Sequence, residues 1–311
     1  MLRLTIVAPV FNEQEVIKRF YDRTRGVLDA LQDVDATILF VVDRSTDNTL
    51  AILRDISNAD ARAKILALSS RFGHQMSLLA GIEYSLESDA IVMMDSDLQH
   101  PPELIPELLA NFDRGFEIVF TIRRDTDNVG VFRKLVGDLF YRALGSISQV
   151  QINANSADFR LISRRVATTL VTEFQERNMF LRGLFSWIGF RQMGIEFVAG
   201  SRAAGTSKYS LSRMLHLAMA GILSFSAKPL QIGIFVGVGF AALAFVYMAI
   251  VVVNFFVDRS IPSGWTTLAA LLLLFNGVQL IVLGIMGAYI GGIYEEVKRR
   301  PHYIVEEKIN F

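Results

Sequence analysis

The chain has 311 residues, a length that predicts one large domain with an appendage rather than one small domain. Its 31 Lys and Arg residues balance its 31 Asp and Glu residues, so the overall charge does not favour nucleic acid and we expect no nucleic-acid partner. Cysteine is absent, which excludes disulfides and thiolate metal sites, and the four His residues lack the spacing of zinc ligands.

Apolar runs typical of strands alternate with runs typical of helices in the amino-terminal part of the chain. The expected strands are Leu2–Ala8, Ala36–Val42, Ala63–Leu68, Ala90–Met94 and Phe116–Ile122. The expected helices are Glu13–Leu31, Asp47–Ile56, His74–Leu86 and Pro102–Arg114. This alternation predicts an α/β fold with a mostly parallel sheet. The first run lacks a small-residue cleavage site, so we interpret it as a strand and expect the part of the chain that contains the sheet to stay in the cytoplasm.

Polar residues follow the expected strands, where parallel sheets bind their ligands. They are Asn12 and Glu13, Asp43 to Asp47, Ser69 to Gln75, and Asp95 to Gln99. The dinucleotide pattern G-x-G-x-x-G and the P-loop pattern G-x-x-x-x-G-K-[ST] are both absent. We therefore expect any phosphate groups to be bound by a metal ion and basic side chains rather than by a glycine-rich loop.

The string MDSDLQHPPE, residues Met94 to Glu103, is the most informative motif. If Asp95 and Asp97 continue the strand before them, their side chains point to one face and Ser96 points to the other. Two such carboxylates at the end of a buried strand are costly unless a positive group lies between them, and a divalent cation with oxygen ligands fits that place. The alternative is a solvated acidic turn before a helix that starts at Pro-Pro.

Two long apolar stretches, Pro229–Val257 and Trp265–Tyr294, lie near the end of the chain. Each exceeds the roughly 20 residues that cross a bilayer, and the absence of a polar face argues against a buried soluble helix. The short connection predicts a hairpin. Basic residues flank the hairpin on both sides whereas the connection contains only Arg259, so both ends are expected in the cytoplasm. Glycines in the second stretch allow close helix packing and a possible homo-oligomer.

Six motifs occur in a fixed order: APVFNE (8–13), VVDRSTDNT (41–49), RFGHQ (71–75), MDSDLQHPPE (94–103), ADFRL (157–161) and GTSKYS (205–210). With them the chain resembles the family 2 glycosyltransferases of the GT-A fold, within them the polyisoprenyl-phosphate glycosyltransferases. That group contains dolichyl-phosphate mannose synthase and bacterial undecaprenyl-phosphate glucosyltransferases. The resemblance covers Leu4 to about Ser210, and the two-span tail matches the bacterial branch.

The resemblance implies a nucleotide-sugar donor, a polyprenyl-phosphate acceptor and Mg²⁺ or Mn²⁺. The residues implied for the nucleotide sugar are Pro9, Asn12, Glu13, Asp43, Arg71, Asp95 and Ser96. Those implied for the metal are Asp95, Asp97 and Gln99, and those for the acceptor phosphate are Arg160, Arg202 and Lys208. The implied catalytic residues are Asp95, Asp97 and Asp158, of which Asp158 either acts as a general base or orients the acceptor.

Several of these assignments have alternatives. Arg44 stands where the family usually has glycine, and it either contacts the diphosphate or the base or points to solvent. Asp158 and Arg160 are alternatively a surface ion pair. Arg202 and Lys208 are alternatively contacts to anionic lipid. His74 is expected to be structural or a weak phosphate contact.

The expected layout is a cytoplasmic GT-A domain (1–175), a juxtamembrane region (176–228), two membrane helices (229–257 and 265–294) and a cytoplasmic tail (295–311). In the juxtamembrane region, Phe180–Ile188 and Tyr209–Lys228 are interpreted as helices lying in the membrane interface, with a core helix as the alternative for the first.

The predicted activity is inverting transfer of glucose from UDP-glucose to undecaprenyl phosphate at the bacterial inner membrane. The alternatives are a mannose or amino-sugar synthase, or a non-catalytic protein that binds nucleotide sugars. A processive polysaccharide synthase is disfavoured, because a Q-x-x-R-W signature and additional spans are missing.

Overall fold

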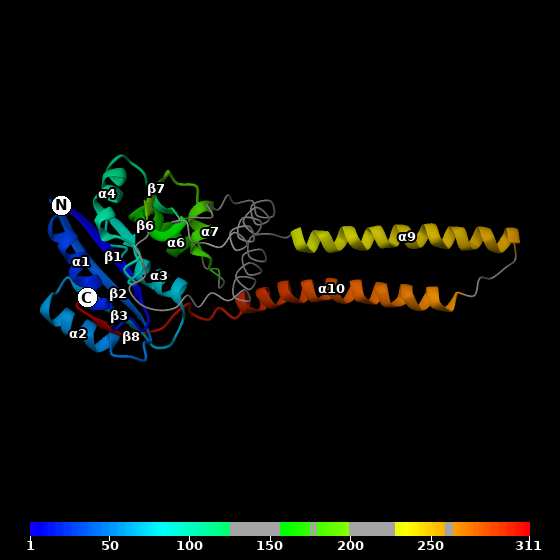
Figure 1. Ribbon diagram of the computed structural model, residues 1–311, viewed down its shortest axis with the longest axis horizontal. Helices are drawn as coiled ribbons and strands as arrows, with labels where there is room; N and C mark the ends of the chain where they lie inside the picture. Colours follow the sequence, from blue (N-terminus) through cyan, green and yellow to red (C-terminus); the bar gives the residue numbers. More distant parts are fainter. Residues whose placement is uncertain (125–155, 175, 177–178, 199–227, 259–263) are drawn as a thin grey trace. The chain divides into compact units, whose positions relative to one another are not determined.

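A computed structural model of the protein describes residues 1–124, 156–174, 176, 179–198, 228–258 and 264–311 (Figure 1). The chain divides into two compact units. The first contains the amino-terminal part of the chain together with residues Arg300–Phe311, and the second contains two long helices. The predicted residues Arg202 and Lys208 lie outside the described residues, as does almost all of the expected helix Tyr209–Lys228.

The first unit is built on an eight-stranded sheet within the described residues. In chain order the strands are β1 (Leu2–Val10), β2 (Val34–Asp43), β3 (Ala63–Leu68), β4 (Ala90–Met93), β5 (Ile118–Arg124), β6 (Ser156–Ser163), β7 (Gln192–Val198) and β8 (Val305–Ile309). Their order across the sheet is β7-β5-β6-β4-β1-β2-β3-β8. Strands β4, β1, β2 and β3 are parallel neighbours, whereas β6 and β8 are antiparallel to their neighbours. The predicted α/β fold with a mostly parallel sheet is confirmed.

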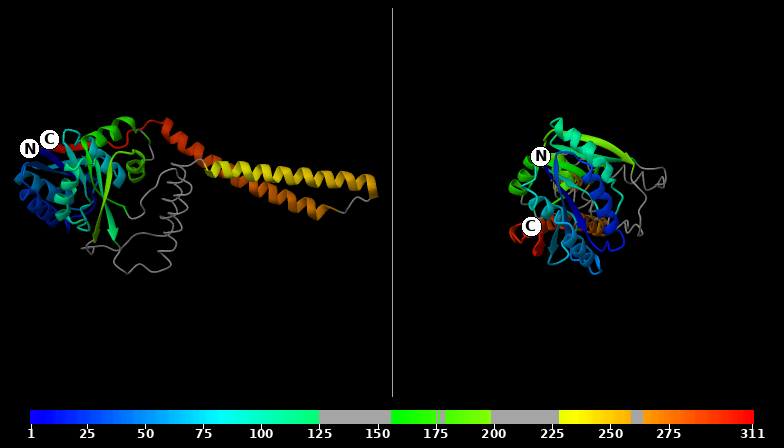
Figure 2. Two further views of the ribbon diagram at one scale, coloured as in Figure 1. Left: turned by 90° about the horizontal axis from the view of Figure 1, so that it is seen from above. Right: turned by 90° about the vertical axis from the view of Figure 1, so that its left-hand side faces the viewer.

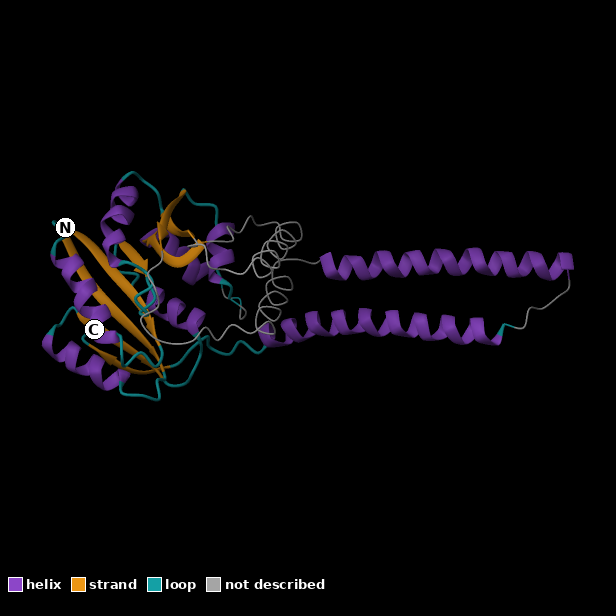
Figure 3. Cartoon of the chain, in the orientation of Figure 1, coloured by secondary structure: helices purple, strands orange, loops and turns teal. Residues whose placement is uncertain are grey.

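Helices cover both faces of this sheet (Figure 3). They are α1 (Ile17–Asp29), α2 (Thr49–Ala59), α3 (His74–Glu83), the short η1 (Pro102–Leu104) leading into α4 (Ile105–Asp113), α6 (Arg164–Glu173) and α7 (Leu181–Trp187). Alternation along β1 separates the faces, because Leu4 and Ile6 belong to a core cluster with side chains of α1, α2 and α4. Val7 points the other way, where Gly81 of α3 packs closely against it.

Helix α7 falls within the stretch Phe180–Ile188. The sequence predicts this stretch as a helix in the membrane interface, with a core helix as the alternative. Leu181, Leu184 and Phe185 are buried within the first unit, whereas Trp187 is 59% exposed. The buried face of α7 is therefore part of the protein core, as the core-helix alternative predicts.

The carboxyl-terminal residues 295–311, expected as a cytoplasmic tail, contain a strand of the sheet. Strand β8 pairs antiparallel with β3 and forms one edge of the sheet. Its sequence VEEKI alternates half-buried and exposed residues. Strand β7, which follows the predicted boundary at residue 175, belongs to the same sheet.

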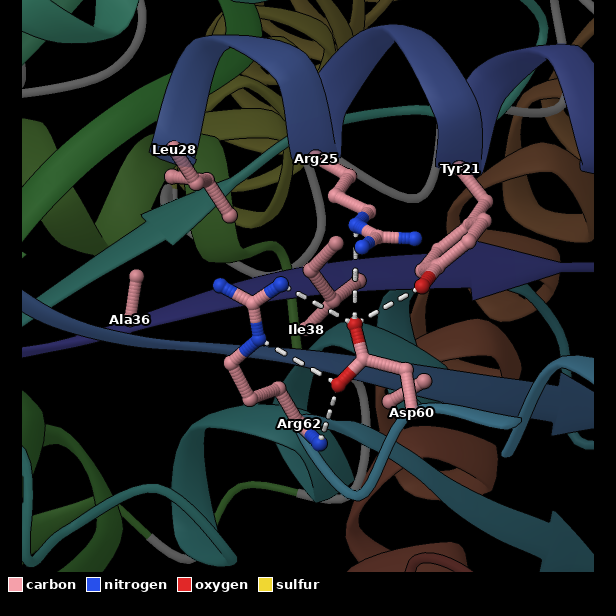
Figure 4. A pocket seen from close by; sticks show the side chains of 8 residues that line it. Tyr21, Arg25, Leu28, Ala36, Ile38, Asp60 and Arg62 are labelled. Atoms are coloured by element: carbon pink, nitrogen blue, oxygen red, sulfur yellow. Dashed lines mark hydrogen bonds and ion pairs between the residues drawn. The ribbon is translucent and has the colours of Figure 1, made fainter. Parts of the chain in front are cut away.

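A polar cluster joins α1 to the turn between α2 and β3 (Figure 4). The Asp60 carboxylate accepts hydrogen bonds from the Tyr21 hydroxyl (2.8 Å) and from the guanidinium and backbone of Arg62. Burial alone raises the pKa of Asp60, but the hydrogen bonds from Arg62 outweigh it and lower that pKa to about 2. The cluster lies at the amino end of β3, so it serves the fold and not the carboxyl edge of the sheet.

The second unit consists of α9 (Lys228–Asp258) and α10 (Trp265–Val297). The two helices run side by side in both long views (Figures 1 and 2), and the rings of Phe240 and Phe275 meet edge to face at 5.4 Å. Each helix contains a segment long and apolar enough to cross a membrane, Leu230–Val251 and Leu274–Val297. The predicted pair of apolar helices is confirmed.

Candidate active site

The loops at the carboxyl edge of the sheet are tied to one another by hydrogen bonds. Asn12 follows β1, and its side chain accepts from the backbone N–H of Thr46 (2.8 Å) and donates to the Thr46 hydroxyl (3.1 Å), so it joins the loops after β1 and β2. The Glu13 backbone N–H donates to the Thr49 hydroxyl at 2.9 Å. Of the predicted nucleotide-sugar residues, Asn12 and Glu13 thus also hold the loop after β2 in place.

Asp95 and Asp97 lie in a turn and not on the strand. Strand β4 ends at Met93, so the strand alternation that placed both carboxylates on one face does not apply. The turn is instead fixed through Ser96, whose hydroxyl is buried and donates to the Pro9 carbonyl at 3.0 Å. The predicted residues Pro9, Asp95, Ser96 and Asp97 are thereby brought together at the ends of β1 and β4.

Two histidines contact Asp95. His74, the first residue of α3, brings its Nε2 to 2.7 Å from the Asp95 Oδ1. His100 is buried, and its Nδ1 accepts the backbone N–H of Asp95 at 3.1 Å. The same Nδ1 lies 3.7 Å from the Asp95 Oδ2. His74 is thus the side chain that bonds the Asp95 carboxylate, and His100 holds the backbone of the turn.

The pairing with His74 sets the charge of Asp95. Burial alone raises the pKa of Asp95, but the hydrogen bond from His74 outweighs it, and the pKa falls to about 2. Burial likewise lowers the pKa of His74, and the hydrogen bond and charge of Asp95 raise it above its ordinary value. Asp95 is thus ionised at neutral pH, as a metal ligand must be.

The side chains of the acidic turn fit a hard divalent cation in donor type. Asp95 and Asp97 offer carboxylate oxygens, and Gln99 offers an amide oxygen that also lies 3.5 Å from the Arg123 Nη1. Among the described residues, no group of three or more His, Asp and Glu side chains forms a closed metal cage. Mg²⁺ is typically bound through one or two carboxylates together with substrate phosphates and water, so a partial shell of this kind suits it.

A second charged cluster, formed by Asp158, Arg160 and Arg182, lies on the α3 face of the sheet. Because β6 runs antiparallel to β4, its first residues reach the carboxyl edge, with Arg160 paired to Met93. Both Asp158 oxygens accept hydrogen bonds from the Arg182 guanidinium of α7, at 3.2 and 3.0 Å. Arg160 is buried, 4.0 Å from the Asp158 carboxylate and 4.6 Å from the Phe185 ring centre. The alternative of a surface ion pair is therefore wrong.

The charges of this cluster shift the pKa values of Asp158 and Arg160. Burial raises the pKa of Asp158, but the charges of Arg182 and Arg160 outweigh it, so that pKa is lowered overall. Burial and the charge of Arg182 lower the pKa of Arg160 to about 10, against the opposing effect of Asp158. The charges of Asp158 and Arg182 also act on His74. The acidic turn and this cluster therefore form one electrostatic site.

Asp43 is buried and shapes the loop after β3. Its two carboxylate oxygens accept the backbone N–H groups of Phe72 (2.7 Å) and Gly73 (3.0 Å). Gly73 has a φ of +93°, a conformation that suits glycine, and it leads directly into His74. The geometry gives Asp43 a role in positioning the RFGHQ motif, and its predicted contact with the nucleotide stays a prediction.

The two basic residues near this loop have separate partners. Arg44 is exposed and donates to the Ser69 carbonyl at 2.6 Å, which links the ends of β2 and β3. Arg71 stacks over the Phe11 ring at 4.1 Å. Of the alternatives for Arg44, the structure shows a backbone contact that none of them included.

Two features of the site were not predicted from the sequence. One is the contact of His74 with Asp95, and the other is the presence of Arg182 in the site. His74 stood in the quoted motif RFGHQ, so a signal for it existed. Arg182 stood in a stretch interpreted through its large apolar residues, and its partner is 24 positions away. No spacing pattern could have paired them.

An α/β sheet with an acidic turn at its carboxyl edge, bonded to the end of its first strand, is the arrangement of a GT-A glycosyltransferase. The sequence matches glycosyl transferase family 2 over residues 5–170, and the chain belongs to this family.

Relatives extend the match over nearly the whole chain. An uncharacterized glycosyltransferase of Bacillus subtilis, YkcC, is 41% identical, with 98% of this chain and 94% of the relative covered. The prophage-derived bactoprenol glucosyl transferase of Shigella flexneri is 35% identical, with 98% of each covered. Among solved structures, a glucosyl-3-phosphoglycerate synthase from Mycobacterium tuberculosis aligns with a TM-score of 0.47 and 17% identity, covering 71% of this chain and 78% of that one.

Proposed function

We propose that the protein is a membrane-anchored, inverting glycosyltransferase that moves glucose from UDP-glucose to a polyprenyl phosphate such as undecaprenyl phosphate. The observation that carries the proposal is the joined site of Asp95, Asp97 and the Asp158–Arg182 pair, in a chain similar over 98% of its length to a bactoprenol glucosyl transferase. The apolar helices α9 and α10 support the anchor, because each is long enough to cross a hydrocarbon core of ~30 Å.

The reaction breaks the bond between the anomeric carbon and the nucleoside diphosphate and forms a bond from that carbon to an acceptor phosphate oxygen. In-line attack inverts the anomeric centre. A phosphate monoester has its second pKa near ~6, so at neutral pH the acceptor is already mostly a dianion and needs little help from a base. The work left to the protein is to orient the acceptor and to stabilise the charge of the leaving diphosphate.

The residues of the site divide these tasks by charge. Asp95 and Asp97, with Gln99, would hold Mg²⁺ or Mn²⁺, and such an ion supplies Lewis-acid stabilisation of the diphosphate when bound. Arg160 and Arg182 both contact Asp158, so two guanidinium groups lie on this side of the site. Guanidinium groups suit the phosphate of the acceptor. His74 keeps Asp95 ionised and oriented.

A transfer assay with detergent-purified protein tests the proposal. UDP-glucose, UDP-N-acetylglucosamine and GDP-mannose, each labelled in the sugar, are offered separately with and without undecaprenyl phosphate, in Mg²⁺, Mn²⁺ or EDTA. The expected result is a labelled lipid that forms from UDP-glucose only with acceptor and metal present. Product from another donor alone would reassign the sugar. Metal-dependent binding of a nucleotide sugar without any product would favour a non-catalytic protein.

A further inference from the structure

The carboxyl-terminal segment Tyr303–Asn310 contacts both ends of the stretch that carries His74. The Ile304 carbonyl accepts the backbone N–H of Ser69 at 2.9 Å, at the start of the loop before α3. The hydroxyl of the neighbouring Tyr303 donates to the carboxylate of Glu83, the last residue of α3, at 2.5 Å. Two adjacent residues, Tyr303 and Ile304, thus hold the stretch 69–83 at its end and at its beginning.

The clamped stretch is itself part of the site. Its Phe72 and Gly73 amides donate to buried Asp43, and its His74 contacts Asp95. The Ser69 carbonyl accepts from Arg44, so the same residue is held from both sides. A shift of α3 along its axis would therefore change the distance between His74 and Asp95.

Further contacts attach the segment firmly to the sheet. The Asn310 side chain donates to the carbonyls of Ser57 (2.8 Å) and Ala63 (3.1 Å). Burial and the hydrogen bond to Glu83 raise the pKa of Tyr303, so its hydroxyl remains a donor throughout the physiological range. The segment follows α10 in the chain, and it is bonded to α3 rather than left as a free tail.

We infer that Tyr303 is a positioning residue of the active site, which acts through α3 to hold the His74–Asp95 pair and the loop 69–73 in their nucleotide-sugar-binding arrangement. The inference rests on the proposed function for its kinetic consequence alone. Its structural consequence, the order of residues 69–76, is measured without any substrate.

Hydrogen exchange of the detergent-purified full chain tests the inference with matched variants. Tyr303→Phe and Glu83→Ala both remove the Tyr303–Glu83 bond, whereas Glu83→Gln keeps an acceptor for it. Glu307→Gln is the control on the same segment, because Glu307 pairs with Arg54 of α2 and not with α3. In Tyr303→Phe and Glu83→Ala, we expect peptides covering residues 69–76 to exchange about fivefold faster, which is the factor for the loss of one hydrogen bond. In Glu83→Gln and Glu307→Gln, these peptides should exchange at the wild-type rate.

The kinetic readout separates positioning from chemistry. In Tyr303→Phe the KM for the nucleotide sugar should rise about fivefold while kcat stays within about twofold of the wild type. Unchanged exchange at residues 69–76, or an equal increase throughout β2 and β3, would overturn the inference, since the second result signals only lost stability. If exchange rises as expected but no sugar is transferred by any variant or by the wild type, the positioning role stands and the proposed function fails.

Discussion

At the scale of single residues, the partners of Asp158 decide what it can do in catalysis. Both of its oxygens accept from Arg182, and the charges of Arg182 and Arg160 lower its pKa, so it is a weak base. Removal of a true general base costs about 10²- to 10⁴-fold in rate. We predict that Asp158→Asn loses less than about 100-fold and Asp95→Asn loses more, because Asp95 acts on the leaving diphosphate.

The measurement is the initial rate of sugar transfer by both variants at saturating substrate, with circular dichroism to show that each is folded. A larger loss in Asp158→Asn than in Asp95→Asn would restore Asp158 as the base.

The same scale shows which site residues a sequence can reveal. Asp95 and Asp97 were predictable because their motif is contiguous and follows an apolar strand. The partners of these residues were not predictable, since His74 reaches Asp95 from the start of α3 and Arg182 reaches Asp158 from α7. These two contacts depend on how the helices pack on the sheet. They also depend on the antiparallel direction of β6, which brings Asp158 to the carboxyl edge.

At the scale of elements, the packing of α3 on β1 depends on Gly81. A Cβ at this position would lie 2.1 Å from the Val7 Cγ1, whereas a Cβ at Gly26 of α1 would meet nothing within 4 Å. We predict that Gly81→Ala destabilises the protein by about 1–3 kcal/mol through overpacking. Gly26→Ala should stabilise it by about 0.5–1 kcal/mol, because alanine loses less backbone entropy in a helix.

Thermal unfolding of the two variants in the same detergent compares them directly. Equal shifts of Tm in the two variants would mean that α3 can move away from β1 at little cost, which would contradict the close packing.

Asp60 couples α1 to the α2–β3 turn in a pH-dependent way. Its pKa is about 2 in the folded protein and about 3.9 in an unfolded chain, so the ionised form stabilises the fold. This contribution, ~2 kcal/mol, is fully present above the unfolded pKa and is lost as the pH falls from about 4 to about 2.

We predict that Asp60→Asn lowers the stability at pH 6 and flattens the pH dependence between pH 4 and pH 2. Urea unfolding at a series of pH values checks this. A variant whose stability falls as steeply as that of the wild type over this interval would assign the acid sensitivity to other carboxylates.

At the scale of the whole molecule, the sequence predicted β1 to β5, the helices between them and the two apolar helices to within a few residues at most ends, but it did not predict β6, β7 or α6. Hydrophobic periodicity carries both signals. It could not predict β8, because an edge strand of three charged residues between Val305 and Ile309 has little apolar pattern of its own. Its place beside β3 is set by pairing with residues some 240 positions earlier in the chain, as in the contact between Ile65 and Ile309.

The absence of cysteine makes the membrane arrangement directly testable. If α9 and α10 span the membrane as a hairpin with positive residues inside, the connection between them lies outside the cytoplasm and β8 lies within it. Single substitutions Ser260→Cys and Glu306→Cys place one thiol in each region. In intact spheroplasts, a membrane-impermeant maleimide should label Ser260→Cys at once and Glu306→Cys only after permeabilisation. Labelling of both only after permeabilisation would instead mean that the two helices lie along the inner face of the membrane without crossing it.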